Sequence, residues 1–134
     1  MQARRILLIA TAVLFAAIDL LHKEFTSAEF HHARTPYVAL VVGGLIVALV
    51  VLAPRVPSNA AALGAGIACG GAAGNLVSLL AWSHGVPDPF VLVGARYGLA
   101  FNLADLFAVS GDALLLSAVI LHGLHQRGKL SARI

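Results

Sequence analysis

The stretch GLAFNLADLFAVSGD, Gly98 to Asp112, has the composition of a membrane-spanning helix but carries an asparagine and two aspartates. These residues are Asn102, Asp105 and Asp112. A carboxylate inside a membrane segment is rare, because burial in hydrocarbon is costly, and it faces the bundle interior or a water-filled cavity. The stretch therefore predicts a spanning helix that contributes side chains to a polar site.

The whole chain has the composition of a membrane protein. Of its 134 residues 60% are apolar and 11% are charged, and the mean hydropathy is +0.91. The formal charge of +3 comes from basic residues near segment ends, which suits anionic lipid headgroups better than a nucleic-acid groove. The single cysteine, Cys69, excludes an intrachain disulfide, a CxxC redox pair and a thiolate zinc cluster. We therefore expect membrane lipids as partners and no nucleic acid.

Four apolar stretches predict the fold class. At about 17 to 25 residues each, they are long enough to cross roughly 30 Å of hydrocarbon. They cover approximately residues 6–21, 37–53, 60–82 and 99–121. A short proline-containing turn at 53–59 joins the second and third stretches, and longer polar connections join the others. The sequence predicts an all-α integral membrane protein, a four-transmembrane-helix bundle that forms one domain over residues 1–134.

The basic residues predict the orientation. Six of them lie at one set of segment ends and three at the other, and cytoplasmic loops carry the excess of lysine and arginine. The larger group is Arg4, Arg5, Arg55, Arg127, Lys129 and Arg133, and the smaller is Lys23, Arg34 and Arg96. Both termini are therefore expected in the cytoplasm, with the protein multi-pass in the plasma membrane. A cleaved signal peptide is the alternative interpretation of the N-terminus, but the apolar run continues to Lys23, and an even number of spans requires it.

Polar residues of different segments fall at one expected depth, near the outer membrane surface. They are Asp19, Asn75, Ser78, Asp88, Asn102 and Asp105. Two carboxyl groups held close together cannot both ionise cheaply, so one can act as a base on water while the other protonates a leaving amine. This indicates aspartic-protease chemistry, with Asp88 and Asp105 as the catalytic pair and with Asn75 and Asn102 holding them by hydrogen bonds.

Each of these residues also has a structural interpretation. Asp19 and Lys23 have the i,i+4 spacing of a surface ion pair, with the lysine reaching outward to the membrane edge. Asp88, between two prolines, could be an ordinary turn aspartate. Asp112 could be an interior polar residue satisfied by Ser110 or by a neighbouring helix.

Three glycines of the third apolar stretch have the small-xxx-small spacing that lets helix backbones approach closely, which favours packing over a site. They are Gly66, Gly70 and Gly74.

The histidines of the chain are candidate metal ligands, because imidazoles can bind metals. Adjacent histidines rarely point at one ion, however, and no HExxH spacing occurs, so we expect no metal. The outer histidines are His22, His31, His32 and His84, and His122 and His125 are expected to cap the end of the fourth helix.

The order of the motifs resembles signal peptidase II, the lipoprotein signal peptidase family of four-span intramembrane aspartic proteases. DLLHK at 19–23 matches the family's DxxxK, and GGAAGNLVS at 70–78 resembles GGAxGNxxD. FNLAD at 101–105 matches the NxAD motif, which supplies one catalytic aspartate. GVPDPF at 85–90 occupies the place of the G-x-V-x-D-F segment, which supplies the other.

The chain departs from the family pattern at three places. Ser78 and Leu79 stand where the family has Asp-Arg, and Asp88 lies about one residue late between prolines. HHARTPY at 31–37 replaces the N-x-G-x-A-F segment, and the first outer loop is short where the family forms a small β-structured cradle for the lipidated substrate.

The resemblance implies an endopeptidase that cleaves a prolipoprotein before its lipid-modified cysteine, without a cofactor. Asp88 and Asp105 would share a proton and activate water, while Asn75, Asn102 and Ser78 support the site and Asp19 and Lys23 stabilise the outer helix ends. One alternative is a catalytically inactive homologue that acts as a membrane subunit or lipid-binding protein beside another membrane protein. A small transporter using Asp105 and Asp112 is the other.

Overall fold

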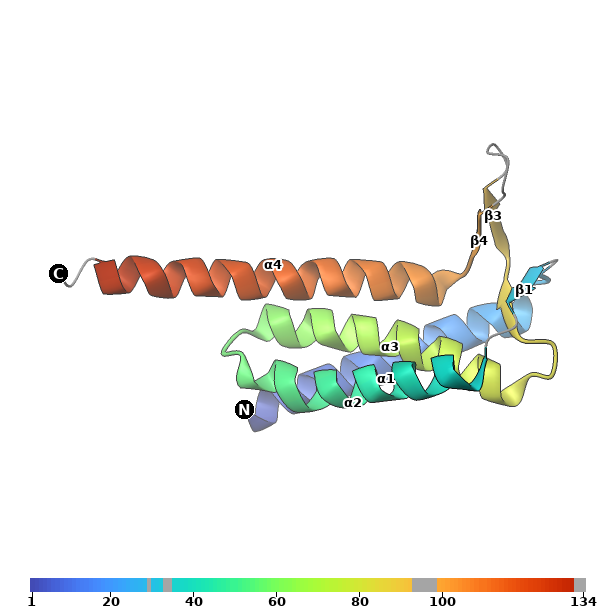
Figure 1. Cartoon of the computed structure of the whole chain (residues 1–134), viewed down its shortest axis with the longest axis horizontal. Coiled ribbons are helices and arrows are strands. Elements are labelled where there is room, and N and C mark those ends of the chain that lie inside the picture. The colour runs from blue at the N-terminus through green and yellow to red at the C-terminus, as the bar shows by residue number, and fades with distance from the viewer. Residues whose placement is uncertain (29, 33–34, 93–98, 132–134) are drawn as a thin grey trace.

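Four long helices make up most of the computed structural model, which describes the chain except residues 29, 33–34, 93–98 and 132–134. The helices are α1 (Gln2–Phe25), α2 (Pro36–Leu52), α3 (Asn59–Ala81) and α4 (Leu103–Ser131), and the short 3-10 helix η1 (Ala53–Arg55) joins α2 to α3. They run along the long axis of the molecule (Figure 1). The helices α1, α3 and α4, and α2 together with η1, are each long and apolar enough to cross a membrane, so the four predicted spans correspond to four helical segments.

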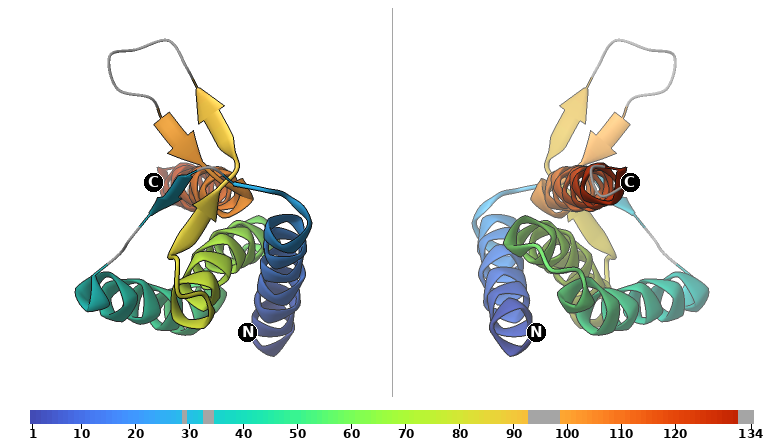
Figure 2. Two further views of the ribbon diagram at one scale, coloured as in Figure 1. Left: turned by 90° about the vertical axis from the view of Figure 1, so that its right-hand side faces the viewer. Right: turned by 90° about the vertical axis from the view of Figure 1, so that its left-hand side faces the viewer.

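Four short strands lie at the end of the bundle where α1 stops and α4 starts (Figures 1 and 2). β1 (Phe30–His32) pairs antiparallel with β2 (Val86–Asp88), and β3 (Phe90–Leu92) pairs antiparallel with β4 (Leu99–Phe101). The all-α prediction was therefore wrong in this region, and the fold is mostly helical with two small sheets. Pro87 and Pro89 explain the difference, because proline and the residue before it favour extended backbone.

The fourth helix differs from its predicted bounds. Leu99 to Phe101, predicted as the start of the span, form β4, and the helix begins at Leu103. It then continues past Leu121 to Ser131, so His122 and His125 lie within the helix and the prediction that they cap its end was wrong. Hydropathy shows only which part of a helix can lie in the apolar layer of a membrane. The polar residues after Leu121 still have sufficient helix propensity, so the helix continues beyond the predicted span.

Helix α3 packs between α1 and α4, and glycines allow the close approach on both sides. A Cβ at Gly66 would lie 2.7 Å from the Leu8 carbonyl oxygen of α1, and one at Gly70 would lie 2.6 Å from Phe15 Cβ. Toward α4, Gly64 faces the backbone of Gly111, itself a glycine. The predicted packing role is confirmed for Gly66 and Gly70, whereas a Cβ at Gly74 would meet the side chain of Asp19.

The start of α1 and the end of α4 lie at the end of the bundle opposite the strands (Figure 1). Arg4, near the N-terminus, donates from Nε to the Pro54 carbonyl oxygen at 3.1 Å and so ties α1 to η1. Of the basic residues used for the orientation, Arg34, Arg96 and Arg133 lie outside the described residues. The start of α1 and the end of α4 thus lie at the same end of the bundle, as an even number of spans requires.

Candidate functional site

A buried lysine joins α1 to α3 at the strand end of the bundle. Lys23 donates from Nζ to Asp19 Oδ2 at 2.6 Å, to Asn75 Oδ1 at 2.7 Å and to Ser78 Oγ at 3.3 Å. The side chains of Asp19 and Lys23 are fully buried. The ion pair expected from the i,i+4 spacing is therefore present, but the interpretation of Lys23 as an outward-reaching lysine was wrong. Three acceptors compensate the cost of burying the ammonium group.

The second oxygen of Asp19 connects the same cluster to α4. Asp19 Oδ1 accepts a hydrogen bond from the backbone N–H of Ala104 at 2.9 Å. The first N–H groups of a helix have no partner within the helix, and a carboxylate there also interacts favourably with the helix dipole. Asp19 therefore holds the start of α4 in place against α1.

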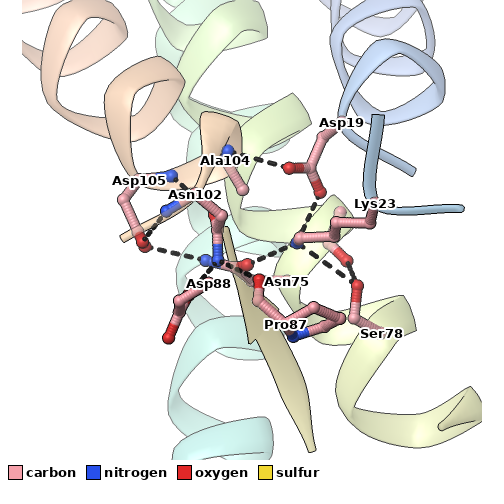
Figure 3. Close-up of polar contacts among 10 residues, drawn as sticks. Asp19, Lys23, Asn75, Ser78, Pro87, Asp88, Asn102, Ala104 and Asp105 are labelled. Carbon is pink, nitrogen blue, oxygen red and sulfur yellow. Dashed lines mark hydrogen bonds and ion pairs between the residues drawn. The ribbon is translucent and has the colours of Figure 1, made fainter. Parts of the chain in front are cut away.

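Asn102 and Asp105 bond to each other around the start of α4 (Figure 3). The Asn102 side-chain oxygen accepts from the Asp105 N–H at 3.2 Å, and Asp105 Oδ2 accepts from the Asn102 N–H at 3.1 Å. This reciprocal arrangement is a capping box. The asparagine and aspartate of the NxAD motif thus have a local structural reason for their spacing of three, which the sequence analysis missed.

Asn102 also reaches the other aspartate. Its Nδ2 donates to Asp88 Oδ1 at 2.6 Å and to the Pro87 carbonyl oxygen at 3.3 Å. Asp88 is fully buried in β2, so its interpretation as a turn aspartate was wrong. Asp105 Oδ1 in turn accepts from Asn75 Nδ2 at 2.9 Å. Both candidate carboxylates are therefore bonded to Asn102.

The structure brings all seven residues proposed from the sequence into one hydrogen-bonded network (Figure 3). They are Asp19, Lys23, Asn75, Ser78, Asp88, Asn102 and Asp105. The network joins α1, α3, α4 and β2, and the Lys23 ammonium attracts the carboxylates of Asp19, Asp105 and Asp88. The residues therefore converge at the strand end of the bundle.

The structure adds to the site one residue that the sequence did not place there, His32. His32 Nδ1 contacts Asp88 Oδ2. His32 was considered only as a metal ligand, because the pairing of β1 with β2 is not visible in the sequence. The other outer histidines lie elsewhere: His31 is near His84, and His22 stacks on Phe90 with ring centroids 5.3 Å apart.

Asp112 lies apart from the network. It is exposed on α4, and Ser110 Oγ donates to the Phe107 carbonyl oxygen. The prediction that Asp112 is an interior residue satisfied by Ser110 was wrong. A transport path through Asp105 and Asp112 therefore lacks the interior position that it would require.

A pocket of about 480 Å³ opens beside the network. Asp105 and His32 face it among apolar side chains, which are Leu92, Leu99, Ala100, Phe101, Leu106 and Val109. A pocket with a few polar groups in an apolar lining is the usual form of a ligand site. Asp105 is thus accessible from a cavity suited to an apolar ligand.

Comparison with known proteins identifies the family of the chain. Residues 16–121 match the family model described as signal peptidase (SPase) II. A search of curated proteins finds no match. The matched range includes every residue of the network and all four helices in whole or in part, and together with the four apolar helices it indicates an integral membrane protein. The chain belongs to the signal peptidase II family.

Proposed function

We propose that this protein is an aspartic endopeptidase that processes lipoprotein precursors, in keeping with its family. It cleaves the peptide bond before a lipid-modified cysteine at the outer surface of the plasma membrane. The termini and the basic residues near them then lie in the cytoplasm. Asp88 and Asp105 are the catalytic residues of this proposal.

The observation that carries the proposal is the position of Asn102 between the two acids. It donates to Asp88 Oδ1 through its side chain, and its backbone N–H donates to Asp105 Oδ2. Two carboxyl groups held by one residue suit a reaction that needs a base and an acid on either side of one peptide bond.

The reaction follows from this arrangement. One carboxylate takes a proton from water as the water oxygen forms a bond to the scissile carbonyl carbon. The other carboxyl group gives its proton to the amide nitrogen as the carbon–nitrogen bond breaks. The products are a carboxylic acid and an amine, and the first acid returns its proton to the second. Asn75 and Asn102 hold the two acids during these steps.

The pocket beside Asp105 supports a substrate with apolar groups. Six of its lining side chains are apolar. An acyl chain or the apolar part of a signal peptide can exchange its contacts with lipid tails for van der Waals contacts with this lining. A site at the end of the bundle is also accessible to a lipid-anchored substrate directly from the membrane.

The test is cleavage of a diacylglyceryl-modified prolipoprotein by the full-length protein in lipid vesicles, followed by gel mobility. Asp88→Asn and Asp105→Asn are each expected to abolish cleavage, because the amide can neither accept nor release the proton. Asp112→Asn on the same helix is the matched control and is expected to cleave normally. Cleavage retained in either of the first two variants removes that aspartate from the mechanism.

The alternative of an inactive homologue rests on Ser78 and Leu79, which replace the family's Asp-Arg. The network offers a reason for the exchange that does not require loss of activity. Ser78 accepts from Lys23 and donates to the Gly74 carbonyl oxygen, so its hydroxyl group is satisfied. An acidic and a basic residue are replaced together, which leaves the net charge of this region unchanged. Absence of cleavage by the unaltered protein would favour the inactive membrane subunit.

A further inference from the structure

The imidazole of His32 contacts Asp88 and has no role in the reaction proposed above. Asp88 is fully buried, and both of its carboxylate oxygens are in contact, Oδ1 with Asn102 Nδ2 and Oδ2 with His32 Nδ1. We propose that His32 is a positioning residue of the site, which fixes the plane of the Asp88 carboxylate relative to Asp105. This inference rests on the proposed function.

The strand pairing accounts for this contact. In the β1–β2 ladder Phe30 lies opposite Asp88, and His32 lies opposite Val86. Alternate residues of a strand point to the same face, so His32 and Asp88 are diagonal neighbours on one face of the pair. His31 points to the other face, where its ring lies near His84. The backbone therefore selects His32, and not the adjacent His31, to meet the aspartate.

The two contacts of Asp88 have different consequences. The plane of a carboxylate turns about the Cβ–Cγ bond, and the hydrogen bond at Oδ1 restrains this rotation on one side of that axis. The contact at Oδ2 restrains it on the other side, so the two together hold the plane more tightly than either alone. An ionised carboxylate can only accept hydrogen bonds, so His32 Nδ1 is the donor when Asp88 is charged. Charged groups around this pair are Asp105 of α4, which faces the same pocket as His32, and the Lys23–Asp19 pair of α1.

His32 lies between the buried aspartate and the pocket. Its side chain is 58% exposed, and it lines the pocket together with Asp105. Removing an exposed ring leaves no cavity in the helix bundle, and the β1–β2 ladder is made by backbone groups. Truncation of His32 is therefore expected to change the site without unfolding the protein.

The first experiment measures steady-state cleavage of the modified prolipoprotein in vesicles. His32→Ala is expected to lower kcat by about 10- to 100-fold, the effect of misplacing a catalytic group by about 1 Å, with KM nearly unchanged. His32→Asn is expected to recover most of the loss, because its amide nitrogen is attached to Cγ as Nδ1 is. His31→Ala is the matched control and keeps the normal kcat. Circular dichroism checks that each variant is folded.

The second experiment does not depend on cleavage. The ¹⁵N resonances of the His32 imidazole are expected to move on Asp88→Asn and to stay in place on Asp112→Asn. An unchanged His32 resonance in Asp88→Asn overturns the proposal.

The kinetic outcomes separate the two proposals. If the unaltered protein cleaves and His32→Ala has normal or raised kcat, only the positioning role is overturned, and a raised kcat identifies the imidazole as an obstruction. If the unaltered protein cleaves no precursor, the proposed function fails and the positioning role fails with it.

Discussion

Lys23 Nζ lies 2.7 Å from Asn75 Oδ1, and this contact sets the orientation of the Asn75 amide. An ammonium group can only donate, so the amide oxygen faces Lys23 and the amide nitrogen is left to donate to Asp105 Oδ1 at 2.9 Å. Lys23 of α1 thus determines that Asn75 of α3 presents its amide nitrogen, a hydrogen-bond donor, to Asp105 of α4. The finding connects the buried ion pair to a proposed catalytic acid.

Asn75→Ala is expected to lower kcat by about 10- to 100-fold through misplacement of Asp105. The substitution also leaves Lys23 without one acceptor, at a cost of about 1 to 3 kcal/mol in the free energy of unfolding. Cleavage kinetics and unfolding in detergent measure the two effects. Ser110→Ala, an exposed hydroxyl on α4, is the control. Normal kcat in Asn75→Ala would show that Asp105 does not need this donor.

Two substitutions of Asn102 separate its two contacts. Serine is as good a helix N-cap as asparagine, whereas alanine loses about 1 kcal/mol, and neither can reach Asp88. Both variants leave the buried Asp88 Oδ1 without its donor, which costs about 1 to 3 kcal/mol in the free energy of unfolding. Asn102→Ser is therefore expected to be about 1 kcal/mol more stable than Asn102→Ala but to lose kcat as strongly. Thermal unfolding and cleavage rates of the pair make the comparison. A normal rate in Asn102→Ser would mean that the cap is the residue's whole role.

Lys23→Met is expected to lower the free energy of unfolding by about 3 to 5 kcal/mol, because Asp19 is left as a buried charge without its partner. The measurement is reversible unfolding in mixed micelles. Lys129→Met, on the exposed last turn of α4, is the matched control and is expected to have little effect. A small loss in Lys23→Met would contradict a structural role for the buried pair.

Gly71→Ala tests the close packing of α3 on α4. The added Cβ would collide with the Ala104 carbonyl oxygen and lie 2.9 Å from the Ala108 nitrogen, both backbone atoms. Overpacking of this kind costs about 1 to 3 kcal/mol. Gly43→Ala on α2 meets no atom within 4 Å and is expected to be neutral or slightly stabilising. Equal unfolding of the two variants would contradict the observed packing.

Ser78→Asp tests the charge balance around Lys23. The new carboxylate would join Asp19 at a single ammonium group, and an uncompensated buried charge costs several kcal/mol. Adding Leu79→Arg supplies a second cation and is expected to recover part of the lost stability. Thermal unfolding of the single and double variants checks this, and an undiminished stability of the single variant would refute the argument.

The sequence by itself determined the four spans and most of the site. Hydropathy over 20 or so residues identifies a membrane helix because the thickness of the hydrocarbon fixes the length of an apolar run. The polar residues that interrupt such runs are costly there, so Asp19, Asn75 and Asp105 could be identified as site residues before any coordinates. The resemblance to the family motifs also made Asp88 a candidate, because GVPDPF lies where the family has its other catalytic aspartate.

Only the tertiary structure decided how these residues are connected. The spacing of Lys23 from Asp19 predicts the ion pair but not its burial, so the sequence is equally compatible with an outward-reaching lysine. The pairing of β1 with β2 joins strands of three residues across more than fifty positions of chain, and no local pattern predicts it. That pairing brings His32 to Asp88. Spacing within a helix is set locally, whereas contacts between segments depend on the packing of the whole chain.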